Sequence, residues 1–206
     1  MPTLAPPPVN NERHALREFL AYHQRAFVAV AYGLTDEQAR ATPSVSSLSV
    51  GGLIKHVTGV QQSWMQRVAA APPNEPQADD RPFEDRAQEY QEQYLMRPDE
   101  TLAQLIETLV AQNAESLRLI ETTDLDAAVP VPRDAPWFPD DVDAWSVRWV
   151  LLHLIGELAR HAGHADIIRE SIDGATMYEL VAAAEGVAPP AVADPVAPQH
   201  VTGHSV

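Results

Sequence analysis

The stretch from Trp145 to Glu170 (WSVRWVLLHLIGELARHAGHADIIRE) constrains the fold of this chain more than any other. It carries His153, Glu157 and His161 at intervals of four residues. Residues four apart on a helix lie on one face, so these side chains point the same way. The apolar positions follow the same helical period: Val150, Leu154, Leu158, Ala165 and Ile168. A carboxylate beside an apolar stripe is costly unless it is paired, so the pattern predicts a partner for Glu157.

Three other stretches show the apolar period of a long helix. They run from residue 10 or 11 to Tyr32, from Ser49 to Ala71, and from Asp99 to Glu121. Residues 72–98 are rich in Pro, Asp, Glu and Gln and predict a long crossover, with some helix near residues 83–95. The sequence therefore predicts an all-α fold, a four-helix bundle with a long crossover between its second and third helices.

Shorter signals fill the connections between these helices. Thr35 begins a capping-box pattern that predicts a short helical turn, and Gly33 suits the end of the first helix. Val129 and Val131 suggest a brief extended piece before the fourth helix. A short helix from Met177 to Ala184 is expected to close the domain.

The chain is expected to form one domain between two tails. Its 206 residues suffice to bury a core. Residues 1–9 are Pro-rich and predict a flexible lead, residues 10–185 form the bundle, and residues 186–206 predict a disordered tail of Ala, Pro and Val. His200 and His204 lie in that tail, so we assign them no role.

Charge and composition narrow the classes of function. The formal net charge is −15, from 29 acidic and 14 basic residues, which argues against nucleic acid and anionic membranes as partners. The chain has no cysteine, so disulfides, thiolate metal sites and a cysteine nucleophile are excluded, and any thiol must come from a small molecule. No apolar run of membrane-spanning length and no secretory signal is expected, so a cytoplasmic location is the default.

A metal site is the sharpest explanation for Glu157. Glu157 and His161 have the spacing with which one helix chelates an ion, and His56 lies on the core-facing stripe of the second helix. Three protein ligands with an open fourth position is the arrangement of catalytic zinc. Nickel, iron and manganese also suit nitrogen and carboxylate ligands, and the sequence does not choose among them.

The alternative is a set of buried histidines satisfied by hydrogen bonds, with Glu157 paired to Arg160 or Arg148. His153 could be a fourth ligand or an outer donor, but a packing role with a backbone partner fits it better. His164 could serve as an outer donor to the site or as a general base.

Other residues of similar type read first as structural. His14 and His23 on the first helix are expected at the surface or in packing. The tryptophans are expected to anchor the core and helix ends, and only secondarily to form pocket walls: Trp64, Trp145 and Trp149.

Two motifs resemble the DinB-like superfamily: LSVGGLIKHVTGVQQSWMQRV around His56, and the later stretch that contains ARHxGHADxxRE at Ala159 to Glu170. The similarity spans Leu16 to Ala184 and is greatest to an actinobacterial branch. It implies a four-helix bundle with a metal held by one residue of the second helix and two of the fourth. Most members use HxxxH for that pair. Here the pair is Glu157 and His161, a variation similar to the His, Glu, His zinc site of mycothiol-dependent maleylpyruvate isomerase.

The resemblance implies a function as well as a fold. Related bundles include transferases and isomerases that use mycothiol or a similar thiol, so we expect a metal-dependent enzyme acting on such a thiol and a small electrophile. His56, Glu157 and His161 would bind the metal, with His153 or His164 tuning the site. The alternatives are a non-catalytic metal-binding or ligand-binding stress protein and a helical dimerisation module. A homodimer is expected because similar bundles often form one.

Overall fold

A computed structural model describes residues 3–71, 85, 88, 91–132, 138–139 and 141–189. Residues 83–84, 86–87 and 89–90 of the helix expected near residues 83–95, and residues 190–206 of the expected tail, lie outside the described residues. The boundaries of the expected tails therefore stay predictions.

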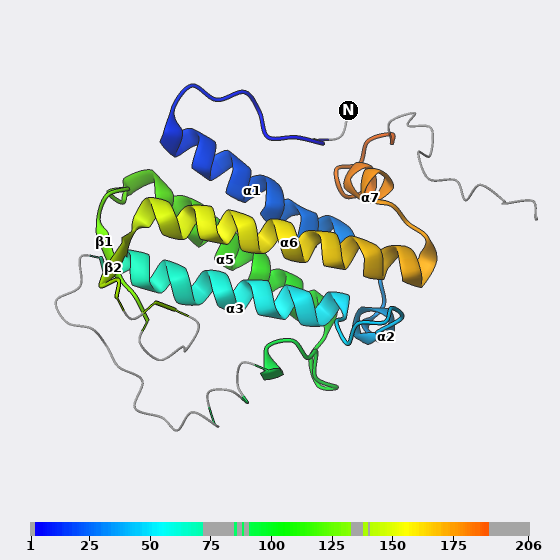
Figure 1. The fold of residues 1–206 in the computed structure, drawn as a ribbon. Coiled ribbons are helices and arrows are strands. Elements are labelled where there is room, and N and C mark those ends of the chain that lie inside the picture. Colours follow the sequence, from blue (N-terminus) through cyan, green and yellow to red (C-terminus); the bar gives the residue numbers. More distant parts are fainter. Residues whose placement is uncertain are drawn as a thin grey trace, which may run out of the picture.

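Four long helices pack as a bundle: α1 (Glu12–Val30), α3 (Val50–Ala69), α5 (Leu102–Thr122) and α6 (Val147–Asp173). Helix α1 packs against α5 and α6, and α3 also packs against α5 and α6. Figure 1 shows α1 and α6 running in one direction and α3 and α5 in the other. Because α3 and α5 are parallel, the chain between them must return along the bundle. The predicted all-α bundle with a long crossover is thus confirmed.

Polar side chains determine where the long helices begin. Asn11, Ser49, Thr101 and Ser146 each accept a hydrogen bond from a backbone N–H of the first turn that follows. Thr101 and Gln104 form a reciprocal capping box, and for this reason α5 starts later than the predicted Asp99. None of the helices in the described ranges combines the length and the apolar character needed to cross a membrane.

Short elements close the two ends of the bundle. The capping-box turn at Thr35 opens α2 (Asp36–Arg40), and α7 (Met177–Ala184) follows α6, both as the sequence predicted. Strands β1 (Ala128–Pro130) and β2 (Ala144–Ser146) pair antiparallel, with Val129 opposite Trp145. The expected extended piece at Val129 is therefore a strand. Its partner β2 was not predicted, because Trp145 was assigned to the fourth helix.

Arg169 of the ARHxGHADxxRE motif joins the ends of two helices. Its side chain is buried and donates to the carbonyl oxygens of Val30 and Tyr32, each at 2.7 Å. It also pairs with Asp173 at 2.9 Å. The last carbonyls of a helix have no partner within it, so Arg169 satisfies that of Val30 at the end of α1 and fixes α1 against α6.

Two adjacent glycines bring the crossover against the start of α3. A Cβ at Gly52 would lie 2.0 Å from the backbone oxygen of Tyr94, and one at Gly51 would lie 2.4 Å from the Sδ of Met96. Only a residue without a side chain allows this approach. The glycines, one turn before His56 on α3, therefore determine the position of the Tyr94 backbone.

Replacing Gly52 with Ala should lower the free energy of unfolding by about 2 kcal/mol, because the new methyl group overlaps the Tyr94 backbone. Gly156→Ala on α6 is the matched control, since a Cβ there meets nothing within 4 Å. The control should gain about 0.5–1 kcal/mol from helix propensity. Urea denaturation measures both. Equal stability of Gly52→Ala and wild type would contradict the close packing of the crossover.

Candidate metal centre

His56, Glu157 and His161 meet between α3 and α6. Each offers a potential ligand atom, and these atoms all lie within 4.8 Å of one another. His161 Nε2 is 3.5 Å from Glu157 Oε2, and the ring centroids of His56 and His161 are 4.8 Å apart. We call these three residues the His–Glu–His cluster. The three side chains that the sequence selected from two distant segments are thus brought together.

Burial and neighbouring charges determine the protonation states of His56 and Glu157. His56 is 2 % exposed, and burial followed by the charge of His161 lowers its pKa to about 4. The hydrogen bond from His161 lowers the pKa of Glu157. At neutral pH, His56 is therefore an uncharged imidazole and Glu157 an ionised carboxylate. These are the protonation states in which both residues bind metal.

The spacing of the His–Glu–His cluster fits one divalent ion. Zinc binds nitrogen and oxygen at about 2.0–2.2 Å, which places tetrahedral ligand atoms roughly 3.3 Å apart. The 3.5 Å between Glu157 and His161 already matches, and His56, whose ligand atom lies within 4.8 Å of theirs, would have to come up to about 1.5 Å closer. Two nitrogens and one oxygen suit zinc, and also nickel, iron or manganese. The residues present thus fit the metal that the sequence suggested.

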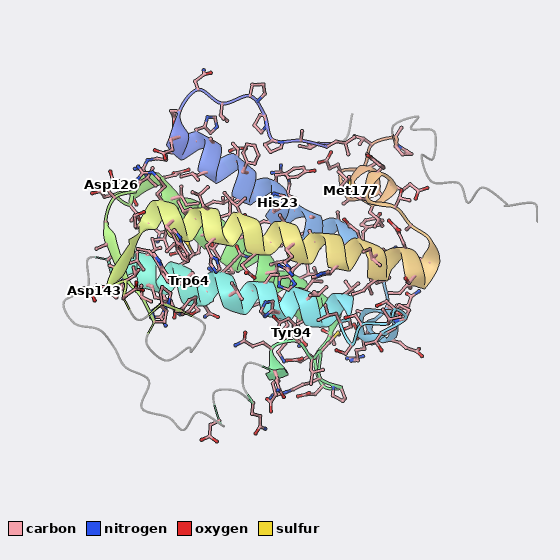
Figure 2. The ribbon with its side chains drawn as sticks, in the orientation of Figure 1. His23, Trp64, Tyr94, Asp126, Asp143 and Met177 are labelled. Atoms are coloured by element: carbon pink, nitrogen blue, oxygen red, sulfur yellow. The ribbon has the colours of Figure 1, made fainter. Side chains whose placement is uncertain are left out.

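Tyr94 of the crossover covers one side of the site. Its Oη lies 3.0 Å from His56 Nε2, and its ring stacks on that imidazole with centroids 3.9 Å apart. The ring is also 6.2 Å from that of His161, and Figure 2 shows Tyr94 beside α3 on the crossover side. The sequence analysis did not place Tyr94 at the site. The Gly51-Gly52 pair was the available signal that the crossover approaches α3 here.

His164 lies on the side of the His161 ring away from Glu157. Its Nδ1 is 3.5 Å from His161 Nδ1, while the Nε2 of His161 faces Glu157. A histidine that uses one ring nitrogen for a metal usually needs a hydrogen-bond partner at the other. The position of His164 is consistent with the outer role expected for it.

His153 lies among aromatic rings. Its ring stacks on Trp149 at 5.0 Å and meets the edge of Trp64 at 5.3 Å. Burial lowers its pKa, and the negative charge of Glu157 opposes that shift. Among the described residues, the group that could hold a metal does not include His153. His153 lies one turn before Glu157 on α6 and packs against the two tryptophans.

Trp64 is the centre of this aromatic group, and Figure 2 shows Trp64 towards the end of α3 that lies near β1 and β2. Phe138, Trp145 and Trp149 surround it with ring centroids 5.7–5.9 Å away. Trp145 and Trp149 stack on each other at 3.9 Å. The group packs the end of the core, as the sequence suggested for the tryptophans.

One of the alternative partners of Glu157 is engaged elsewhere. The guanidinium of Arg148 pairs with Glu12 at 2.5 Å and with Asp126. Glu157 instead contacts His161, with 3.5 Å between Oε2 and Nε2. An arginine pairing through Arg148 therefore does not account for the carboxylate.

Two histidines and one glutamate that converge between two helices place the protein in the class of helical bundles with a candidate metal site. Comparison with known families identifies the chain more closely. The family model described as mycothiol-S-transferase matches residues 15–174, so the chain belongs to this family, a member of the DinB-like superfamily. None of the curated proteins compared matches the chain.

Among solved structures, the chain is similar to a conserved protein from Enterococcus faecalis. The TM-score is 0.53 and the sequence identity 16 %, over 81 % of this chain and 100 % of that one. At this identity the similarity concerns the fold alone.

The lowered pKa of His56 predicts a pH dependence of stability in metal-free protein. Between the ordinary value of 6.5 and the folded value of about 4, the unfolded chain binds the proton and the folded chain does not. The contribution of His56 to the free energy of unfolding is therefore complete above pH 6.5. As the pH falls towards 4, up to about 3 kcal/mol of this contribution is lost. Urea denaturation in EDTA measures this.

His56→Gln is the control for that pH series, because it removes one titrating group and leaves the others. The free energy of unfolding of the wild type, relative to that of the variant, should decrease as the pH falls from 6.5 to 4. A difference that stays constant across this range would contradict the neutral, buried state of His56.

Proposed function

We propose that this chain is a metal-dependent S-transferase that uses mycothiol or a similar low-molecular-weight thiol. The observation that carries the proposal is the His–Glu–His cluster, whose potential ligand atoms lie within 4.8 Å of one another. Membership of the mycothiol-S-transferase family supports the choice of thiol. Zinc is our first choice of metal, and nickel, iron and manganese are the alternatives.

In this proposal the chain holds a cation and leaves the thiol to the substrate. A bound divalent cation would supply positive charge that lowers the pKa of a neighbouring thiol and so produces a nucleophile at neutral pH. The chain has no cysteine of its own to compete for that cation. His56 and His161 contribute neutral nitrogens, and Glu157 contributes one negative charge. A net positive charge of one would therefore remain to attract a thiolate.

Two histidines are proposed to act around the cluster rather than within it. With His161 Nε2 facing the cation, its Nδ1 carries the proton, and His164 Nδ1 at 3.5 Å can accept it in a hydrogen bond. This contact would orient the His161 ring. His153 is proposed to limit water access next to Glu157 by stacking on Trp149.

The proposal also covers the second substrate, the cellular location and the oligomeric state. A small electrophile would be the second substrate, and the cytoplasm the location. The homodimer expected from similar bundles stays a prediction.

His161→Ala should lose the metal and the transfer of thiol to an electrophile, because two ligands cannot hold the cation tightly. His14→Ala is the matched control, since the His14 side chain is 48 % exposed on α1. Elemental analysis and a thiol-consumption assay give the two readouts. Equal metal content in wild type and His161→Ala would reject the metal assignment.

The same experiment separates the alternative functions. Loss of metal without any thiol turnover in the wild type would favour a non-catalytic metal-binding protein. Wild-type protein that contains no metal and whose melting temperature is unchanged by chelation would favour a dimerisation module.

His164→Ala should retain the metal but weaken its affinity about 10-fold to 100-fold, the usual effect of losing an outer partner of a metal-bound histidine. His164→Asn should recover much of that loss, because its amide oxygen can accept the same hydrogen bond. Competition with a chromogenic chelator measures the affinities. Wild-type affinity in His164→Ala would remove His164 from the site.

A further inference from the structure

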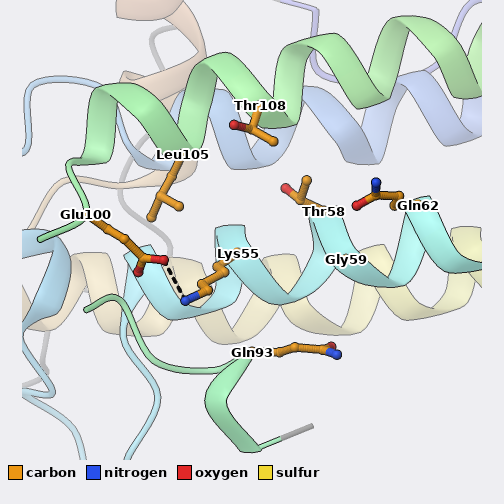
Figure 3. Close-up of a pocket in the computed structure, with 8 residues that line it drawn as sticks. All are labelled: Lys55, Thr58, Gly59, Gln62, Gln93, Glu100, Leu105 and Thr108. Atoms are coloured by element: carbon orange, nitrogen blue, oxygen red, sulfur yellow. Dashed lines mark hydrogen bonds and ion pairs between the residues drawn. The ribbon is translucent and has the colours of Figure 1, made fainter. Parts of the chain in front are cut away.

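A polar pocket lies between α3, α5 and the crossover, and some of its lining residues are within one turn of His56 on α3. It is open to solvent on one side and has a volume of about 350 Å³, within the range of about 300–1,000 Å³ typical of small-molecule sites. Figure 3 shows the polar residues that line it: Lys55, Thr58, Gln62, Gln93, Glu100 and Thr108. Neither the metal proposal nor the family motifs assign a role to this pocket.

The two charges of the pocket neutralise each other. Lys55 Nζ lies 2.7 Å from Glu100 Oε1 and also donates to the carbonyl oxygen of Leu95 at 3.1 Å. A charged ligand would have to compete with this ion pair and leave one charge without its partner. The pocket is therefore better suited to a neutral ligand.

The other polar groups match a ligand that carries many hydroxyls. Thr58 and Thr108 each use their hydroxyl hydrogen on a backbone carbonyl of their own helix, at 2.7 and 2.9 Å. Their oxygens are therefore left as hydrogen-bond acceptors on residues that line the pocket. Gln62 and Gln93 add amides that both donate and accept. A hydroxyl group both donates and accepts, so several hydroxyls can satisfy this lining at once.

The crossover links this pocket to the His–Glu–His cluster. Lys55 and Gly59 line the pocket within one turn of His56 on α3. Gln93 lines the pocket as well, and its side chain also hydrogen-bonds to His56. The next residue, Tyr94, stacks on the His56 ring. A ligand in the pocket thus lies next to residues that touch the cluster.

We infer that this pocket binds the neutral, hydroxyl-rich part of the thiol substrate, such as the sugar part of a glycosylated thiol. The thiol arm would then extend past Gln93 towards His56. The inference rests on the proposed function for the identity of the ligand, but its test depends on neither metal nor turnover.

Gly59 provides the sharpest way to test the pocket. A Cβ added there would have Gln93 Oε1 as its nearest neighbour at 3.6 Å, which is ordinary contact. A leucine side chain would extend further, into the space that the ligand needs. Gly156→Leu is the matched control, because it places the same side chain on α6 where nothing lies within 4 Å.

The probe is mycothiol methylated on sulfur, titrated calorimetrically into the full-length protein with and without zinc. Methylation removes the proton that thiolate formation requires, so binding reports the rest of the molecule. Gly59→Leu should raise the dissociation constant at least 10-fold in both conditions, and Gly156→Leu should leave it unchanged. S-methylated N-acetylcysteine, which lacks the sugar, should bind at least 10-fold more weakly to the wild type.

Thr108→Val provides a second variant should Gly59→Leu fail to fold. It removes one acceptor from the exposed surface of α5 with little change in shape, and it should raise the dissociation constant about 3-fold to 10-fold. Absence of binding to the wild type, or equal binding to wild type and both variants, would overturn the inference. Those results would leave the metal content and the effect of His161→Ala untouched, so the two proposals fail separately.

Discussion

The contact between one carboxylate and two imidazoles organises this protein. Glu157 lies on α6 with its side chain 33 % exposed, one turn from His161 and opposite the buried ring of His56. The hydrogen bond from His161, followed by the charges of the neighbouring histidines, holds the pKa of Glu157 low although burial opposes this shift. A divalent cation between the three groups would satisfy all of them at once. The packing of α3 against α6 holds the three groups together.

Several contacts away from the cluster hold the surrounding helices and the crossover in place. Arg169 fastens the end of α1 to α6, and the β1–β2 pair fixes the point at which α6 begins. On the opposite side, Gly51 and Gly52 let the crossover lie directly on α3, which brings Tyr94 over His56. The crossover is therefore part of the site as well as a connection between parallel helices.

Much of this could be predicted because it depends on local periodicity. The four-residue spacing of Glu157 and His161 fixes their common face on any helix, and the apolar neighbours of His56 place it on the buried side of α3. The crossover could not be predicted in the same way, since its polar composition has no period and Tyr94 reaches the site through tertiary packing. Trp145 was assigned to the helix because the apolar pattern of α6 continues through it. Pairing with Val129 instead makes it part of a strand.

The account depends on a cation between α3 and α6, and anomalous X-ray diffraction from crystals of protein purified without chelator tests this most directly. We predict one strong anomalous peak per chain, within about 2.0–2.3 Å of a nitrogen of His56, a nitrogen of His161 and an oxygen of Glu157. The absorption edge would also identify the metal. Well-ordered side chains of these three residues with no anomalous peak between them, even after soaking in zinc, would contradict the account.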